Sequence, residues 1–312
     1  MKAGPVRDYA IVCPGQGTQS PDMFDLVAAH PRGLAVLQAF GAALGRDLVA
    51  EAQAGTGLHA NAWAQPALVA LARASWEILA PELPAAPAAF AGYSVGEVSA
   101  WSCAGAWDVA TSARIAATRA AMMDEASPPG SGMLAVRGLP LRAIGEQADA
   151  AGLHMAIVNG DDHAVLAGPT AALDMAEAAL APRGAWLRRL EVQVPSHTPL
   201  LAAAAERFAT VVADTPPQAP AAPVLRGIDG RRCFDAPGGL AALARAIAEP
   251  VRWADCMREL SESGVRVVLE LGPGRSLAKL LAEAQPDIDV RSVADFRSWR
   301  GVADWLRARL DA

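Results

Sequence analysis

The pentapeptide Gly92-Tyr93-Ser94-Val95-Gly96 constrains the fold of this chain more than any other segment. Apolar residues 88–91 predict a strand before it, and residues 97–101 predict a helix after it. A glycine on each side of the serine lets a strand turn sharply into a helix, because a side chain there would collide with neighbouring backbone. The pattern therefore predicts a nucleophile elbow.

Ser94 is the candidate nucleophile of this elbow. Its hydroxyl would lie at the amino end of a helix, where backbone N–H groups and the helix dipole favour developing negative charge. A glycine–serine turn without chemistry is the alternative that the pentapeptide alone leaves open.

The composition narrows the class of protein. A chain of 312 residues can build one large domain or two unequal ones, and 53% hydrophobic with 19% charged residues is typical of a compact globule. The net charge of −6 and the pI near 5.4 argue against a nucleic-acid-binding protein. The locally basic segment at residues 226–232 is interpreted as a solvated turn or as part of a docking patch.

The cysteines and the apolar segments exclude further classes. The cysteines form no Cys-x-x-Cys pair, so we expect reduced, mostly buried thiols and no metal site; they are Cys13, Cys103, Cys233 and Cys256. Residues 1–8 lack the apolar core of a signal peptide, and no apolar stretch of about 18 residues follows. We therefore expect a cytoplasmic protein without a membrane segment.

The order of the predicted elements indicates an α/β fold. Residues 9–13 predict a buried strand that runs into a glycine-rich turn, a common edge of a binding cleft in a parallel sheet. Further strands are expected at residues 223–225 and 265–269, and helices at residues 65–79, 109–123, 200–211 and 296–310. Pro66 would lie in the first turn of its helix, and Trp299 and Trp305 of the last helix would pack on the core. Alternation of strands and helices predicts a mainly parallel sheet with helices on both faces.

Residues 131–195 have a different order of predicted strands and helices from the rest of the chain. Strands are expected at residues 133–136, 153–158, 163–167 and 185–194, with helices at 141–151 and 171–181. This β-α-β-β-α-β order is ferredoxin-like. We therefore predict a large α/β-hydrolase-like domain of residues 1–130 and 196–312, into which this small subdomain is inserted.

A nucleophilic serine needs a base, and His197 is the best placed of the five histidines. It follows Pro195 and precedes Pro199, where the chain re-enters the large domain, so its position is rigidly constrained. The other four histidines lie among loop or strand residues without such a setting. We therefore predict a pair of Ser94 and His197.

Six motifs carry a family resemblance. They are Pro14-Gly15-Gln16-Gly17-Thr18-Gln19, Ala64-Gln65-Pro66-Ala67, Gly92-Tyr93-Ser94-Val95-Gly96-Glu97, Arg119, Val194-Pro195-Ser196-His197 and Leu271-Gly272-Pro273-Gly274. In order and spacing they resemble malonyl-CoA:acyl-carrier-protein transacylases over essentially the whole chain. The inserted module is similar to the small domain of that family.

The resemblance implies a reaction. Ser94, with His197 as base, would take the malonyl group from malonyl-CoA and pass it to the thiol of an acyl carrier protein. Malonyl-CoA would be the substrate and the carrier protein the partner, and neither a bound cofactor nor a metal is implied.

The resemblance also assigns the binding residues. The backbone N–H groups of Gln16 and Val95 would form the oxyanion hole. Arg119 would pair with the free carboxylate of malonate, which selects malonyl over acetyl groups. Gln65 and Tyr93 are the further residues assigned to substrate binding.

Two positions depart from the family pattern. Tyr93 stands where fatty-acid transacylases usually have a histidine. Ala246 stands where the family often has a glutamine whose backbone carbonyl orients the catalytic histidine. Tyr93 and the tail at residues 291–298 look more like the epsilon subunit of malonate decarboxylase, whose carrier protein bears a phosphoribosyl-dephospho-CoA arm. Other subunits of that enzyme would then be partners.

Three other functions stay open at this point. Within the family, the chain could serve fatty-acid or polyketide synthesis. A carboxylic-ester hydrolase would share the elbow, but its His-Gly-Gly-type oxyanion loop and its late acidic residue before a C-terminal histidine are not evident. A scaffold that only binds a carrier domain would be favoured if Ser94 resisted acylation.

Overall fold

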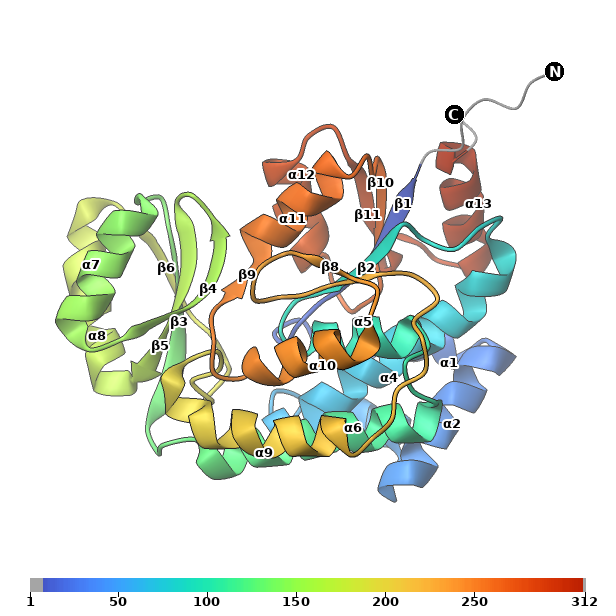
Figure 1. Ribbon diagram of the computed structural model, residues 1–312, viewed down its shortest axis with the longest axis horizontal. Coiled ribbons are helices and arrows are strands. Elements are labelled where there is room, and N and C mark those ends of the chain that lie inside the picture. Colours follow the sequence, from blue (N-terminus) through green and yellow to red (C-terminus); the bar gives the residue numbers. More distant parts are fainter. Residues whose placement is uncertain (1–7, 311–312) are drawn as a thin grey trace.

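The computed structural model describes residues 8–310 and contains two sheets (Figure 1). Residues 1–7, most of the segment inspected for a signal peptide, lie outside the described residues, as do residues 311–312 at the end of the predicted large domain. One sheet has six strands and lies in the larger part, and the other has five strands and lies in the smaller part. The predicted α/β fold class is confirmed.

The six-stranded sheet is parallel except at one edge. In order it contains β11 (Asp289–Ser292), β10 (Val267–Glu270), β1 (Tyr9–Cys13), β2 (Ala89–Gly92), β7 (Val224–Leu225) and β8 (Arg232–Cys233). Only the last pair, β7 and β8, is antiparallel. The central strands β1 and β2 are buried throughout, as expected for strands covered on both faces.

Helices cover both faces of this sheet. They are α1 (Asp25–Ala28), α2 (Pro31–Leu44), α3 (Leu48–Ala54), α4 (Asn61–Leu79), α5 (Gly96–Cys103), α6 (Val109–Ala126), α9 (Ala202–Ala213), α10 (Ala236–Arg245), α11 (Trp253–Glu262), α12 (Ser276–Ala284) and α13 (Trp299–Leu310). Alternate residues of β1 enter different clusters: Ile11 packs with α4 and α5, whereas Val12 packs with α11 and α12. Each face thus has its own core.

The smaller part has the predicted ferredoxin-like order. Its sheet contains β6 (Trp186–Arg189), β3 (Ser131–Arg137), β5 (His163–Pro169), β4 (His154–Gly160) and β9 (Val251–Arg252), in that order. Helices α7 (Leu141–Ala151) and α8 (Thr170–Leu180) cover one face, and the other face turns towards the larger part. Strand β9, which the sequence analysis missed, comes from beyond the insertion and pairs in parallel with β4.

The predicted start of one helix is wrong. Helix α4 begins at Asn61, so Pro66 lies inside the helix and not in its first turn. Pro66 has no N–H to donate to the Ala62 carbonyl one turn earlier. Arg46 Nη1 donates to that carbonyl instead, at 3.3 Å, and this contact from α2–α3 makes an internal proline tolerable.

Two other elements are shorter than expected, and two predictions about side chains are confirmed. Strand β6 ends at Arg189 and does not extend to residue 194, and α13 begins at Trp299 and not at residue 296. Trp299 and Trp305 pack against the core, and Trp299 Nε1 donates to the Leu26 carbonyl at 2.8 Å. All four cysteines are buried free thiols.

Within residues 8–310 no single helix is long and apolar enough to cross a membrane. The bent pair of α2 and α3, which meet at 93°, reaches the required length and composition together.

Candidate active site

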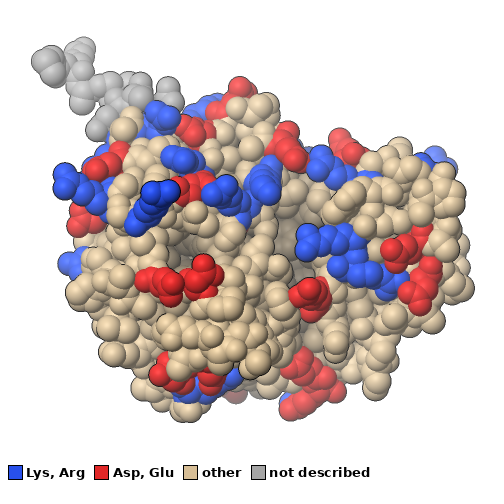
Figure 2. Space-filling model, turned by 180° about the vertical axis from the view of Figure 1, so that it is seen from behind, with Lys and Arg blue, Asp and Glu red and all other residues tan. Residues whose placement is uncertain are grey.

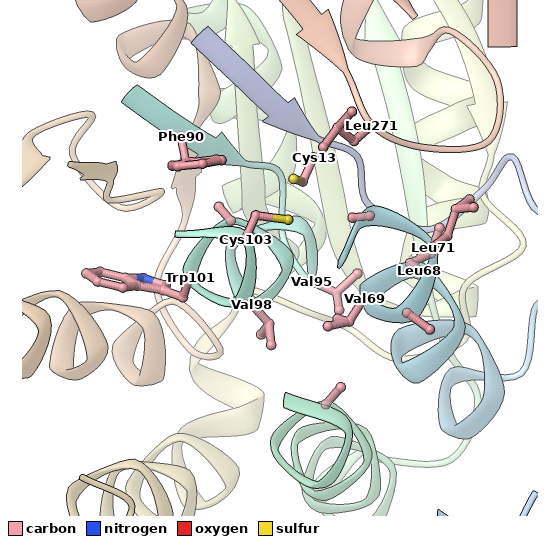
Figure 3. Close-up of a cluster of buried hydrophobic side chains, with 14 of the residues drawn as sticks. Cys13, Leu68, Val69, Leu71, Phe90, Val95, Val98, Trp101, Cys103 and Leu271 are labelled. Carbon is pink, nitrogen blue, oxygen red and sulfur yellow. The ribbon is translucent and has the colours of Figure 1, made fainter. Parts of the chain in front are cut away.

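Strand β2 and helix α5 are joined by a turn at Ser94. Only glycine fits at positions 92 and 96 on either side of this turn. A Cβ at Gly92 would overlap the backbone of Gly96 and Glu97, and a Cβ at Gly96 would overlap the Cys13 carbonyl. Figure 3 shows how the residues around this turn anchor it: Phe90 of β2 and Val98 and Trp101 of α5 are buried side chains of one cluster. The packed elements therefore fix the path of the backbone through Ser94.

Ser94 and His197 face each other directly. His197 Nε2 lies 2.8 Å from Ser94 Oγ, and His197 Nδ1 lies 2.5 Å from the Ala246 carbonyl oxygen. Because a carbonyl only accepts, Nδ1 carries the hydrogen and Nε2 accepts the hydrogen bond from the Ser94 hydroxyl. The carbonyl of Ala246, which stands where the family often has a glutamine, therefore orients the imidazole.

The backbone holds both residues in the same rare conformation. Ser94 has φ of 58° and His197 has φ of 64°, and they are the only non-glycine residues with positive φ among residues 8–310. The His197 N–H also donates to the Ile247 carbonyl at 2.9 Å. Left-handed backbone at non-glycine residues persists only where the surroundings enforce it, and it clusters at functional sites.

The protonation state of His197 suits a base. Burial, and then the positive charge of Arg119, lower the pKa of His197 to about 3, and the hydrogen bond with the Ala246 carbonyl offsets this only in part. The imidazole is therefore neutral at neutral pH. A neutral Nε2 can take the proton from the Ser94 hydroxyl.

Two backbone N–H groups beside Ser94 have no acceptor among the described residues, those of Gln16 and Val95. The loop that carries Gln16 lies against the elbow, since a Cβ at Gly15 would come within 2.9 Å of the Tyr93 carbonyl. The side chain of Val95 is buried among those of α4 and α5, which fixes the direction of its backbone. The two N–H groups are free to bind a negatively charged oxygen.

A chain of amide side chains, of which Asn61 and Gln65 are buried, connects the Gln16 loop to Arg119. Gln16 Nε2 and Gln65 Nε2 both donate to Asn61 Oδ1, at 3.0 and 2.6 Å. Gln65 Oε1 in turn accepts from Arg119 Nη1 at 2.6 Å. Asn61 was not singled out from the sequence, because the predicted helix began after it. Its position in the first turn of α4 joins three predicted site residues.

Arg119 is more deeply buried than expected. It is only 1% exposed and is not among the described residues that line the cavity at Ser94. Its Nε has no hydrogen-bond partner among the described residues. Burial lowers the pKa of this guanidinium to about 10, so it remains charged at neutral pH. A buried cation with an unpartnered donor can bind an anion.

Glu97, directly after the elbow, is a second buried ionisable group near Arg119. Its Oε2 accepts from the Gly227 N–H at 3.0 Å, and its Oε1 has no partner among the described residues. Burial raises the pKa of Glu97 to about 8, although the Gly227 hydrogen bond and the charge of Arg119 lower it in part. The carboxyl connects the elbow helix to the loop between β7 and β8.

A cavity of about 920 Å³ extends from the Ser94–His197 pair. Its inner end is formed by Gly15, Gln16, Tyr93, Ser94 and His197, and its walls are the sheet of the smaller part and helix α12. Tyr93 packs edge-on against Trp253 with ring centroids 5.6 Å apart, and burial raises its pKa to about 12. The volume lies in the range of small-molecule sites.

The sequence analysis missed the outer part of the cavity. Its charged or aromatic residues include Arg137, His163, Trp186, Arg188, Arg275 and Lys279. Figure 2 shows Lys and Arg side chains on both sides of the groove between the two parts. The expectation that the other histidines have no special setting is wrong for His163, which lines the cavity, and for His30, which caps α2 by accepting from the Arg32 N–H at 3.2 Å.

Comparisons with known proteins agree over nearly the whole chain. A family model described as the acyl transferase domain matches residues 10–303. The chain is 33% identical to the malonyl-CoA–acyl carrier protein transacylase of Haemophilus influenzae over 311 residues, which covers 96% of this chain and 100% of that protein.

Solved structures are similar as well. The malonyl-CoA–acyl carrier protein transacylase of Coxiella burnetii superposes with a TM-score of 0.92 and 29% identity, covering 98% of this chain and 99% of that one. A malonyl-transacylase in complex with its type II polyketide acyl-carrier protein superposes with a TM-score of 0.89 and 31% identity, covering 97% and 99%. The chain resembles these proteins in both sequence and fold.

Proposed function

Since this chain belongs to the family of malonyl-CoA–acyl carrier protein transacylases, we propose that it transfers a malonyl group from malonyl-CoA to the thiol of an acyl carrier protein. The observation that carries the proposal is the 2.8 Å contact between Ser94 Oγ and His197 Nε2 at the inner end of the cavity. The proposed intermediate is a malonyl ester of Ser94.

The first half of the proposed reaction acylates Ser94. His197 Nε2 takes the hydroxyl proton while Ser94 Oγ attacks the thioester carbonyl. The carbonyl oxygen becomes negative and accepts hydrogen bonds from the N–H groups of Gln16 and Val95, an interaction worth several kcal/mol in such sites. The carbon–sulfur bond then breaks, and the CoA thiol leaves with the proton from His197.

The second half repeats these steps with the carrier protein. The carrier thiol gives its proton to His197 and attacks the carbonyl carbon of the Ser94 ester. The oxyanion that forms again accepts hydrogen bonds from the N–H groups of Gln16 and Val95. Ser94 recovers its proton as the ester bond breaks, and the malonyl group leaves on the carrier. One neutral imidazole therefore serves both halves of the reaction. Apart from malonyl-CoA and the carrier protein, the proposed reaction needs no further reactant and no cofactor.

Arg119 is proposed to bind the free carboxylate of the malonyl group. Its buried Nε lacks a partner among the described residues, and a charge-assisted pair with a carboxylate would satisfy it. Gln65 would hold the guanidinium through the 2.6 Å hydrogen bond to Nη1. Tyr93, which lines the inner end of the cavity, would bound the space for the acyl group.

Intact-mass measurement tests this proposal. Wild-type protein incubated with malonyl-CoA should gain one malonyl group, and Ser94→Ala should gain none while its circular dichroism spectrum stays unchanged. Addition of a carrier protein with a free prosthetic thiol should remove the group from the wild type. A Ser94→Ala protein that still gained malonyl mass would place the nucleophile elsewhere.

A finer proposal concerns the carrier. Tyr93 and the tail at residues 291–298 support a role for this chain as the epsilon subunit of malonate decarboxylase. Other subunits of that enzyme would then be further partners, and the location would be cytoplasmic. The tail reaches the cavity wall, because its Asp295 pairs with Arg275 at 2.5 Å. Fatty-acid and polyketide synthesis are the alternatives, and the relatives named above favour these.

Transfer rates to two carriers separate these possibilities. The decarboxylase role predicts much faster malonylation of a carrier with a phosphoribosyl-dephospho-CoA arm than of a fatty-acid-synthesis carrier under the same conditions. Equal rates, or a preference for the fatty-acid-synthesis carrier, would rule out the decarboxylase role and leave the general transacylase.

A further inference from the structure

At the outer end of the cavity, the aromatic side chain of Trp186 is not packed into a hydrophobic core. Trp186 is 52% exposed, lines the cavity and belongs to none of the hydrophobic clusters of the described residues. The register of the sheet places it opposite Arg137, which itself lies opposite His163. These three side chains form a row across the sheet at the mouth of the cavity.

The pleat of β6 directs Trp186 and Arg188 to the same side. Successive residues of a strand point to opposite faces. Leu187 packs in the cluster under α7 and α8, and Arg189 pairs with Asp174 of α8 at 2.6 Å, so these two side chains lie on the far face. Trp186 and Arg188 therefore lie together on the face that lines the cavity.

Two cations at this end have no anionic partner. Among the described residues, neither Arg188 nor Lys279 forms an ion pair, although both are exposed and line the cavity. The other two arginines that line the cavity do form ion pairs: Arg137 pairs with Glu283 at 3.0 Å, and Arg275 pairs with Asp295. The mouth thus offers two free positive charges beside an exposed indole.

The distance from the elbow fits a long ligand. Leu190 packs in the same cluster as Tyr93, next to the nucleophile, and Trp186 is four residues farther along the extended chain. Four residues of strand span about 13 Å. Ser94, Leu190 and Trp186 line the same cavity, and the span from Leu190 to Trp186 is one that an extended thioester arm can cover and a malonyl group cannot.

We propose that Trp186 stacks on the adenine of the acyl-CoA donor, while Arg188 and Lys279 bind its phosphates. The inference rests on the proposed function, because it needs a CoA thioester with its carbonyl at Ser94. An aromatic face recognises any base by stacking, and unpaired cations beside it recognise the attached phosphates. This outer subsite acts on the nucleotide end of the donor and not on the acyl group.

Two donors that differ only in the nucleotide end test this subsite. Acylation of Ser94 is followed by intact mass with malonyl-CoA and with malonyl-pantetheine, which lacks the adenosine and phosphates. Trp186→Ala should reduce kcat/KM for malonyl-CoA about tenfold, as expected for loss of one base stack. The same variant should leave kcat/KM for malonyl-pantetheine unchanged, and Trp186→Phe should recover most of the loss.

Phe234 provides a matched control. It is a 71% exposed aromatic side chain that does not line the cavity, so Phe234→Ala should affect neither donor. An equal fall with both donors, or no fall with either, would overturn the inference. Unchanged acylation with slower transfer to the carrier would also overturn it and would assign Trp186 to carrier binding. A wild-type protein that neither donor acylates would remove the proposed function itself, and this inference with it.

Discussion

The inner and outer ends of the cavity are specified in different ways. At the inner end the backbone determines the geometry: glycines that admit no Cβ flank Ser94, and Ser94 and His197 both have left-handed φ. At the outer end, side chains on regular strand and helix backbone determine it, among them Trp186, Arg188 and Lys279. The proposed chemistry depends on rare backbone conformations, whereas the proposed recognition at the mouth depends on the choice of individual side chains.

The largest effect should follow substitution of an elbow glycine. Gly92→Ala places a Cβ in the backbone of Gly96, and no flexible side chain can move to relieve it. We expect a loss of at least about 3 kcal/mol in the free energy of unfolding, with little soluble protein. Gly145→Ala is the control, because its Cβ would lie an ordinary 3.5 Å from Met155 Cε. Thermal unfolding of both variants measures the difference, and equal stability would contradict the role assigned to the elbow backbone.

Loss of the base should be the next largest effect. His197→Ala should slow acylation by roughly 10²- to 10⁴-fold, the usual range for a positioned base. Because its pKa is lowered to about 3, His197 stays neutral on acidification, so protonation of this group should not slow the wild type between pH 8 and pH 5. Acylation rates across this range measure both effects. A near-wild-type rate for His197→Ala at neutral pH would refute the assignment.

Arg119 should show a smaller and selective effect. Arg119→Ala should reduce malonyl transfer by roughly 10²-fold, because a buried charge-assisted pair is worth a few kcal/mol, and should spare acetyl transfer. Arg119→Lys should recover only part of the loss, since an ammonium cannot reproduce the planar fork. Kinetics with malonyl-CoA and acetyl-CoA on the same preparations measure this. An equal fall with both substrates would mean that Arg119 supports the fold only.

The smallest effect is expected at the mouth. Arg137 and Glu283 pair at 3.0 Å across the groove, but their side chains are 47% and 54% exposed. Exposed pairs of this kind contribute about 0–1 kcal/mol, so Glu283→Gln should change the free energy of unfolding by less than about 1 kcal/mol. Chemical denaturation with urea measures it. A loss as large as that of Gly92→Ala would mean that the mouth is as tightly determined as the elbow.

The sequence predicted the inner end well because its geometry needs particular residues. The glycine–serine pattern gave the strand, turn and helix around Ser94, and the position of His197 after Pro195 indicated a constrained histidine. The family pattern pointed to position 246 without fixing which group orients His197, and alanine serves there because a backbone carbonyl does not depend on the side chain.

The sequence could not predict features that depend on long-range register or on a single side chain. Strand β9 has two residues, too few for a periodic pattern, and it exists only because β4 offers an edge. Pro66 suggested the start of a helix, because a proline inside a helix leaves a carbonyl without its N–H partner. The Arg46 side chain that satisfies this carbonyl, that of Ala62, comes from another part of the chain and could not be foreseen. Trp186 and Arg188 lie on a strand of ordinary composition, and only the packing of the two parts shows that they share a cavity.

The two left-handed residues bear on how this chain evolves. Non-glycine residues in this conformation cost of order 1–3 kcal/mol each, and glycine would relieve the strain at position 94 or 197. Mutations that favour stability alone would therefore drive both positions towards glycine, against the demand for a hydroxyl and an imidazole. In a gene copy released from that demand, we expect these two residues to be among the first to be lost.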